Sequence, residues 1–286
     1  MSECFLSIDV GNSKLSAAVV DQHGEILIRD RVPTPARDVW PTLSRLVKRV
    51  MAAAPSRPQG CGVGVSGPID VTAGTVSPLH MPSLVDVPLQ SMVEELTEMP
   101  TVVDHSAKAV ALGEAWRGAA VGESNFVTLV LGSAVTGGIV IGGKLLVGRL
   151  GNAGAIGHVI VEVGGRPCAC GAHGCLEAYC GGMALEAETG RPPQRAPQAI
   201  VERTGILVGR ALASVGAIGD LRLGVIGGAV ALGFGDPFFT AVQQEVDQRA
   251  KLNFTSGFRV VPSRLGLVAP LVGAAALARH AVGAAR

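Results

Sequence analysis

Short apolar or alternating stretches recur along the chain, and this pattern predicts strands in two groups. The first group comprises residues 4–10, 15–20, 25–30, 60–66 and 101–104. The second group comprises residues 126–131, 139–141, 144–147, 221–226 and 259–261. Both groups are interrupted by turn-forming glycine, proline, asparagine and aspartate residues.

Longer segments place apolar residues three or four positions apart, which predicts amphipathic helices. The clearest case is residues 38–54, where the apolar positions are Trp40, Leu43, Leu46, Val47 and Val50. The other predicted helices are residues 87–97, 106–117, 176–188, 196–216, 236–251 and 268–283. Strands that alternate with helices in this way are typical of an α/β protein.

Residues 4–30 and 126–147 share one layout, in which a strand, a glycine-containing turn, a strand, a second turn and a further strand follow each other. This weak duplication predicts two similar halves that face each other across a cleft. We expect the first domain at residues 1–115 and the second at 116–269. The last helix, at about 270–286, is expected to pack back on the first domain.

The amino-acid composition and charge narrow the classes of protein to which this chain can belong. Of 286 residues, 48% are hydrophobic but only 3% are aromatic, so the core must consist mainly of aliphatic side chains. The 24 basic and 23 acidic residues give a net charge of +1, which argues against a nucleic-acid partner. The N-terminus leads directly into a strand, and the apolar windows 223–234 and 265–278 are short or interrupted. We therefore expect no membrane association and a cytoplasmic location.

A group of metal-binding residue types occurs within eighteen positions. It consists of His158, Cys168, Cys170 and Cys175, with glycines between the thiols that allow the backbone to curl around one ion. Three thiolates and one imidazole form a complete tetrahedral zinc site, which predicts a structural Zn²⁺ and leaves no open position for a bound water. The alternative is a loop of buried thiols without a metal. The other cysteines, Cys4, Cys61 and Cys180, are interpreted as inert packing residues.

Three glycine-containing turns follow predicted strands and suit a phosphate or nucleotide. A plain hairpin turn fits the first of them equally well, and only their joint occurrence in a duplicated layout favours nucleotide binding. The candidate nucleotide-binding residues are Asp9, Gly11, Asn12, Ser13, Lys14, Ser133, Ala134, Gly137, Gly138, Gly227 and Gly228.

Taken in this order, these motifs resemble the ROK family (repressor, open reading frame, kinase), whose fold consists of two ribonuclease-H-like domains of the actin-like ATPase type. The most specific part is Gly157-His158 followed by the segment 168–177, which resembles the family's zinc signature. The resemblance covers essentially the whole chain, without the DNA-binding domain that repressor members carry. It implies phosphoryl transfer from ATP, with Mg²⁺, to a hexose hydroxyl, and it implies a homodimer.

The resemblance also implies roles for residues of the sugar pocket, and several of these positions are substituted. The family's catalytic aspartate corresponds to Ser106, and Asp104 is a possible substitute base. The implied sugar-binding positions are His80, His105, Ala155, His158 and Glu177, of which only His158 and Glu177 match the family pattern. In the phosphate motifs, Asn12, Ala134 and Thr136 replace glycines.

Three functions are compatible with these substitutions, of which the third, another reaction on a modified sugar or cyclitol, has no positive evidence in the sequence. The first is a sugar kinase that acts on a hexose or hexose-like substrate, with ordinary glucokinase activity disfavoured because a serine hydroxyl is a poor general base. The second is a non-catalytic homologue that acts as a ligand sensor, regulator or scaffold. The joint substitution at Ser106 and Ala155 motivates the second hypothesis.

Overall fold

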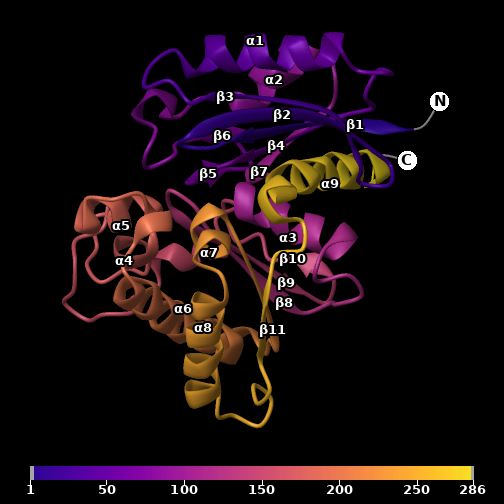
Figure 1. Ribbon diagram of the computed structural model, residues 1–286. Coiled ribbons are helices and arrows are strands. Elements are labelled where there is room, and N and C mark those ends of the chain that lie inside the picture. Colours follow the sequence, from indigo (N-terminus) through magenta and orange to yellow (C-terminus); the bar gives the residue numbers. More distant parts are fainter. Residues whose placement is uncertain (1–2, 285–286) are drawn as a thin grey trace. The chain divides into compact units, whose positions relative to one another are not determined.

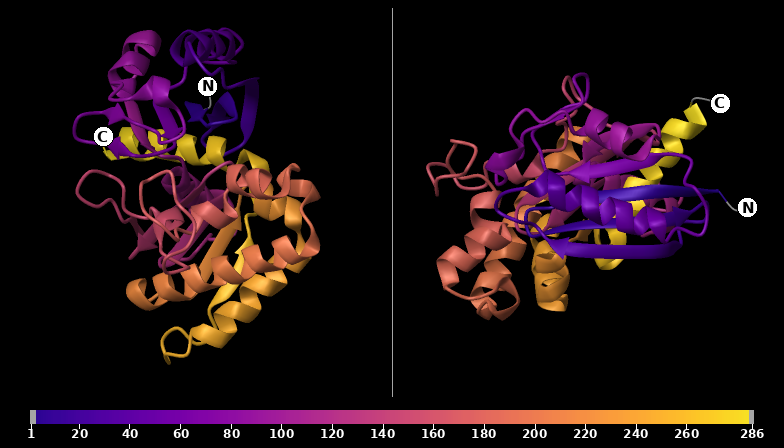
Figure 2. Two further views of the ribbon diagram at one scale, coloured as in Figure 1. Left: turned by 90° about the vertical axis from the view of Figure 1, so that its left-hand side faces the viewer. Right: turned by 90° about the horizontal axis from the view of Figure 1, so that it is seen from above.

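The computed structural model describes residues 3–284 and divides into two compact units. Within the described residues, unit 1 contains 3–117, Val147–Ala153 and 268–284, and unit 2 contains Gly118–Leu146 and Gly154–Leu267. The segment Val147–Ala153 thus lies in unit 1, whereas the division expected from the sequence grouped it with residues 116–269. Figures 1 and 2 show the elements of both units.

Unit 1 is built on a sheet with strand order β3-β2-β1-β4-β7. Its strands are β1 (Cys4–Val10), β2 (Lys14–Asp21), β3 (Ile26–Pro33), β4 (Cys61–Val65) and β7 (Thr101–His105). The first three pair antiparallel as a meander, while β4 and β7 extend the sheet in parallel with β1. A small antiparallel pair, β5 (Ile69–Asp70) and β6 (Thr75–Val76), follows β4 and was not predicted.

Helices cover both faces of this sheet. On one face, α1 (Val39–Ala52) and α2 (Leu89–Thr97) bury aliphatic side chains in the same core as β1 and β4. On the other, α9 (Ala269–Ala284) packs against β1, β4 and α3 (Ser106–Arg117). The yellow α9 lies beside the indigo strands in Figure 1. Close packing depends on glycine, because a Cβ on Gly62 would lie 1.8 Å from the Ala274 carbonyl oxygen.

The window Gly266–Gly283 is long and apolar enough to cross a bilayer, judged by length and composition alone. It extends further than the window 265–278 considered from the sequence. Half of it is buried inside the structure, where α9 packs on the sheet and on α3. This packing within unit 1 accounts for its apolar composition.

Unit 2 repeats the sheet topology of unit 1, with strand order β10-β9-β8-β11-β12. Its strands are β8 (Phe126–Leu131), β9 (Val135–Ile141), β10 (Lys144–Leu145), β11 (Leu223–Gly227) and β12 (Arg259–Pro262). Three antiparallel strands are again extended by two parallel ones. The predicted duplication is therefore present, although β10 is shorter than the predicted strand at 144–147.

The helices of unit 2 include α6 (Gln198–Gly219) and α8 (Asp236–Arg249), which pack together and share one core with β8 and β11. Two shorter helices, α4 (Glu177–Cys180) and α5 (Gly182–Thr189), replace the single helix predicted at 176–188, and α7 (Ala229–Phe234) follows β11. The helix is interrupted at Gly181, whose backbone is extended. The break lets the N–H groups of Gly182 and Met183 bond the carbonyls of Gly132 and Ser133.

Candidate functional site

The carboxyl ends of β1, β4 and β7 lie side by side in unit 1, because these strands are parallel neighbours. Asp9 is at the end of β1, Gly67 follows β4, and His105 ends β7 immediately before α3 begins at Ser106. This edge of the sheet therefore collects residues from three separate motifs. Such an edge is where ligands bind in open α/β sheets.

The structure brings Asp9 and Ser106 into contact, although they are 97 positions apart. The Ser106 hydroxyl donates to Asp9 Oδ1 at 3.3 Å. Asp9 is only 6% exposed, and this burial raises its pKa to about 6 against the opposing effects of Lys14 and of the Ser106 hydrogen bond. The residue at the predicted base position, Ser106, thus has a hydroxyl that is hydrogen-bonded to Asp9, the carboxylate of the first phosphate turn.

That first turn, residues 9–14, is a closed hairpin between β1 and β2. The Gly11 N–H donates to the Lys14 carbonyl at 3.1 Å, and the Thr34 hydroxyl donates to the Gly11 carbonyl at 2.6 Å. Within the described residues, the side-chain oxygen of Asn12 is buried without a hydrogen-bond partner. The turn is therefore held in shape by the protein and carries one polar group that a ligand can satisfy.

His105 packs against the loop that follows β4. Its Nε2 accepts a hydrogen bond from the Gly67 N–H at 3.1 Å. A Cβ on Gly67 would lie 2.6 Å from that nitrogen, so glycine is required for this close approach. His80 lies on the loop after β6, directly after Leu79, whose N–H donates to the Gly67 carbonyl. The two histidines at implied sugar positions thus belong to one local structure in unit 1.

Asp104 forms a buried ion pair with Lys108. The Lys108 ammonium is fully buried and donates to Asp104 Oδ1 at 2.7 Å and to the Gly151 carbonyl at 3.0 Å. Asp104 Oδ1 also accepts from the His105 N–H at 2.7 Å. Sequence reasoning missed Lys108. The helical i,i+4 rule gives no signal for this pair, because Asp104 lies in β7 and Lys108 in α3, and nothing in the sequence indicated the Gly151 carbonyl.

The segment Val147–Ala153 is attached to unit 1 by more than Lys108. The Asn152 amide oxygen accepts from the Ile69 N–H at 2.9 Å, and its NH₂ group donates to the Ile69 carbonyl at 2.8 Å. The Val71 N–H donates to the Leu150 carbonyl. These bonds explain why a segment that lies between two parts of unit 2 in the sequence belongs to unit 1.

In unit 2, the second predicted phosphate turn follows β8 and includes Ser133 and Ala134. The Gly132 N–H donates to the Ala134 carbonyl at 3.0 Å, and the Val135 N–H donates to Glu177 Oε2 at 2.9 Å. Glu177 is buried, so this carboxylate holds the turn to the start of α4. Ala155, by contrast, is exposed.

The remaining candidate glycines of unit 2 allow backbone segments to approach closely. A Cβ on Gly137 would lie 2.4 Å from Ile156 Cδ1, and one on Gly228 would lie 2.2 Å from the Leu131 carbonyl oxygen. Gly228 has a φ of 93°, in the left-handed region. Gly138 lies beside Gly137 in β9, and Gly227 ends β11. The lack of a side chain at Gly137 and Gly228 lets β9 lie close to Ile156, and lets the segment after β11 lie close to the end of β8.

The four residues predicted to bind zinc converge in unit 2. One ligand atom from each of His158, Cys168, Cys170 and Cys175 lies within 4.8 Å of all the others. The Cys170–Cys175 sulfur distance and the distance from Cys168 Sγ to His158 Nδ1 are both 3.7 Å. Tetrahedral zinc with ordinary bond lengths requires about 3.8 Å between sulfurs and about 3.5 Å between sulfur and nitrogen. The donor set and its spacing therefore fit a zinc ion.

The loop that carries these cysteines depends on Gly174. Its φ is 80°, and a Cβ would lie 1.8 Å from the Glu162 carbonyl oxygen. Burial raises the pKa of the Cys175 thiol to about 12, and metal binding takes place through the thiolate. Cys4, Cys61 and Cys180 are buried free thiols away from this cluster, as predicted.

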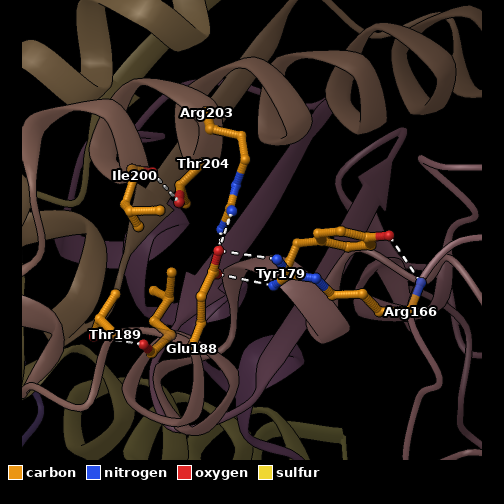
Figure 3. Close-up of polar contacts among 8 residues, drawn as sticks. Arg166, Tyr179, Glu188, Thr189, Ile200, Arg203 and Thr204 are labelled. Atoms are coloured by element: carbon orange, nitrogen blue, oxygen red, sulfur yellow. Dashed lines mark hydrogen bonds and ion pairs between the residues drawn. The ribbon is translucent and has the colours of Figure 1, made fainter.

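A salt-bridge network connects the cysteine loop to the helices that follow it (Figure 3). Arg166 in the loop and Arg203 in α6 both pair with the Glu188 carboxylate of α5 through two hydrogen bonds each. The Arg166 guanidinium also lies 4.7 Å from the ring centroid of Tyr179, whose hydroxyl accepts from the Arg166 N–H. The loop is therefore anchored independently of any metal.

The Glu188 network leads to a prediction about acid stability. The two arginines hold the pKa of Glu188 well below its usual range. Because the folded-state pKa is lowered, this stabilisation is complete above the ordinary carboxyl pKa of about 4.3 and is lost as the pH falls toward the folded value. We expect Glu188→Gln to lower the urea midpoint of unfolding at pH 7, with a difference from wild type that shrinks toward pH 3. An equal change in Glu186→Gln, an exposed position of the same helix, would contradict this.

The arrangement of the two sheets and the site motifs matches one family across the chain. A sequence model of the ROK family matches residues 5–281. The chain belongs to the ROK family. Among the ROK relatives of this chain, an N-acetylmannosamine kinase of Escherichia fergusonii is 30% identical over 247 residues, which are 80% of this chain and 84% of the relative.

Solved ROK structures give the same result for the fold. A ROK hexokinase from Thermus thermophilus superposes with a TM-score of 0.81 at 32% identity, covering 98% of this chain and 99% of that one. A ROK glucokinase from Streptomyces griseus, in complex with glucose and AMPPNP, has a TM-score of 0.84 at 27% identity, covering 97% and 99%. The predicted α/β fold of the actin-like ATPase type is therefore confirmed, and the three similar proteins named here are sugar kinases.

Proposed function

We propose that this chain is a sugar-kinase-like ROK protein that binds ATP and a hexose-like ligand but transfers the phosphoryl group to that ligand slowly. The observation that carries this proposal is that the side chains beside Ser106, the family's base position, already bond other groups of the protein. Ser106 has no carboxylate, and both neighbours that could replace it are already engaged. Loss of a general base costs about 10²–10⁴-fold in rate.

Asp104 is unsuited to replace the missing base because its carboxylate balances the charge of Lys108. If Asp104 accepted a proton, the fully buried ammonium would lose its counter-charge, which is strongly unfavourable. His105 is engaged as well, since its Nε2 accepts the Gly67 N–H. A proton added to Nε2 would make it a donor that faces the Gly67 N–H, which is also a donor.

The nucleotide would be bound by the turn residues already described. In unit 1 these are Asp9, Gly11, Asn12, Ser13 and Lys14, where the turn is preformed and Lys14 supplies a positive charge beside it. In unit 2 they are Ser133, Ala134, Gly137, Gly138, Gly227 and Gly228. Mg²⁺ would accompany ATP and neutralise charge on the phosphates. Positioning of ATP, which supplies much of the catalysis in phosphoryl transfer, is therefore retained in this proposal.

We also propose that Zn²⁺ binds at His158, Cys168, Cys170 and Cys175 and has a structural role. All four positions of a tetrahedral ion are taken by side chains, so the ion would brace the loop that leads into Glu177. For the sugar we propose His80, His105, Ala155, His158 and Glu177 as the contacting positions. A homodimer is part of the proposal by its family resemblance.

The second candidate function is a non-catalytic sensor or scaffold, and the Asp104–Lys108 pair favours it. A buried lysine in this place serves the connection to Gly151 and contributes no group to the transfer. The candidates differ in whether phosphoryl transfer to the sugar occurs at a measurable rate, and a scaffold differs further in needing no nucleotide or sugar.

Calorimetry and turnover measurements together test the proposed function. The purified chain is titrated with Mg²⁺ and AMPPNP, and separately with a panel of glucose, N-acetylmannosamine and related hexoses. Sugar phosphate is then measured with Mg²⁺ and ATP. We expect nucleotide and at least one sugar to bind, with turnover far below the 1–100 s⁻¹ typical of kinases. Turnover within that range contradicts slow transfer. Absence of all binding contradicts the whole proposal and supports a scaffold.

Lys108 gives a separate prediction for stability. Lys108→Met removes one partner of a buried ion pair and leaves Asp104 uncompensated, which costs about 3–5 kcal/mol of unfolding free energy. Adding Asp104→Asn removes the stranded charge, so the double variant is expected to recover part of that loss. Urea unfolding of the wild type, both single variants and the double variant measures the coupling. Strictly additive effects would show that the pair does not act as a unit.

A further inference from the structure

The contact between Ser106 and Asp9 has the form of a nucleophile paired with a base. In kinases an aspartate accepts the proton of the attacking hydroxyl, and contacts between a nucleophile and its base are often longer before the reactants bind. Here the Oγ–Oδ1 distance is 3.3 Å. Ser106 is half-buried, so its hydroxyl keeps access to the carboxyl-end edge of the sheet, while Asp9 is almost fully buried.

We propose that Ser106 is a phosphoryl acceptor, so that the chain transfers the γ-phosphoryl group of ATP to its own Ser106 Oγ. This inference rests on the proposed function, because ATP must bind at the turn 9–14. A bond forms between Ser106 Oγ and the γ-phosphorus, the bond from that phosphorus to the bridging oxygen breaks, and ADP leaves. The hydroxyl proton passes to Asp9 Oδ1 and then to solvent. The products are phosphoserine 106 and ADP.

The position of Ser106 relative to the turn supports this transfer. Asp9 begins the turn that is proposed to hold the phosphates, and the same carboxylate contacts Ser106, so the acceptor lies beside the donor's binding residues. Burial of Asp9 favours its neutral form and makes it a better proton acceptor than a solvated aspartate. Asp104 does not compete for this role, because it is paired with Lys108.

The helix that begins at Ser106 would favour the product, whereas the Asp9 carboxylate, 3.3 Å from Ser106 Oγ, would oppose it by like-charge repulsion. Ser106 is the first residue of α3, a helix that continues to Arg117. Phosphate at a helix N-terminus is stabilised by the N–H groups of the first turn and by the helix dipole. In an ordinary kinase of this kind a sugar hydroxyl accepts the phosphoryl group, whereas here a hydroxyl of the chain would take that part.

The experiment incubates the purified full-length chain with Mg²⁺ and ATP and follows its intact mass, with peptide mapping of any labelled site. We expect the addition of one phosphoryl group at Ser106, with a first-order rate constant that does not depend on protein concentration. Ser106→Ala is expected to lose the label, and Ser106→Thr, which keeps a hydroxyl, to retain it. Ser91→Ala removes a serine from the first turn of α2 and serves as the matched control that stays labelled.

The outcomes distinguish this inference from the proposed function, because nucleotide binding is measured independently by calorimetry. If AMPPNP binds but Ser106 is not labelled, or if the label lies on another residue, self-phosphorylation is wrong and the proposed function stands. If AMPPNP does not bind, both are wrong. A rate constant that rises with protein concentration would overturn transfer within one chain. Asp9→Asn is expected to slow labelling about 10²–10⁴-fold at saturating ATP, with AMPPNP affinity measured in the same variant because Asp9 also belongs to the proposed nucleotide site.

Discussion

Replacing Ser106 with aspartate is expected to raise the rate of sugar phosphorylation by about 10²–10⁴-fold, because it supplies a carboxylate at the family's base position. Combining it with Ala155→Glu should add a charge-assisted hydrogen bond to a sugar hydroxyl, which lowers KM. The measurement is sugar phosphate formed from Mg²⁺ and ATP over the panel described above. The gain should appear in kcat for Ser106→Asp and in KM for Ala155→Glu.

Ser106→Asn is the matched control for this experiment. Asparagine has nearly the shape of aspartate and forms similar hydrogen bonds, but it does not accept the hydroxyl proton. If the aspartate and asparagine variants phosphorylate the sugar at the same rate, proton acceptance at this position is not what limits the wild-type chain. The same two variants should both lose labelling at position 106, which separates the sugar reaction from transfer to the chain itself.

Removal of zinc is expected to have the largest effect on stability. Structural zinc sites contribute an apparent binding free energy of about 10–16 kcal/mol at pH 7, which becomes folding free energy when the unfolded chain does not hold the ion. We therefore expect the purified chain to contain one zinc per molecule by elemental analysis. Chelation, or Cys175→Ala, should release the zinc and lower the melting temperature markedly.

Cys180→Ala is the control for the zinc experiment. Cys180 is a buried thiol of α4 that lies outside the cluster, so its loss creates a small cavity but removes no ligand. This variant should keep its zinc. Purified wild-type protein that contains no zinc and melts at the same temperature as Cys175→Ala would contradict a structural zinc site. The Arg166–Glu188–Arg203 network would then be the main anchor of the loop.

Much of the fold could be predicted because hydrophobic patterning reports burial directly. The strands of both sheets and the long helices follow from period and composition, and the repeated layout indicated the repeated topology. The break between α4 and α5 was missed. Gly181 and Gly182 interrupt a segment of good helix formers, and the break is stabilised by bonds to Gly132 and Ser133, which lie about fifty positions earlier in the chain.

The site was predictable to a similar extent. The four candidate zinc ligands follow from local spacing, whereas the contact of Asp9 with Ser106 was not predicted, since it depends on the parallel strands β1, β4 and β7 ending together. Lys108 escaped prediction because a lysine in a helix is usually solvated, and its burial depends on the Gly151 carbonyl. Long-range contacts of this kind are decided by tertiary structure and leave little trace in the local sequence.

Unit 1 is built from segments near both ends of the chain, and this has a consequence for biosynthesis. Its sheet is encoded in the first 105 residues, but the helix that covers one face, α9, begins only at Ala269. All of unit 2 is therefore synthesised before unit 1 can be completed. Until α9 has been made, Phe5, Ala18 and Val20 of the first strands lack the helix that covers them in the finished protein. Although domains commonly fold in their order of synthesis, here the unit that starts first is completed last. A nascent chain stalled before residue 269 would expose this surface to chaperones.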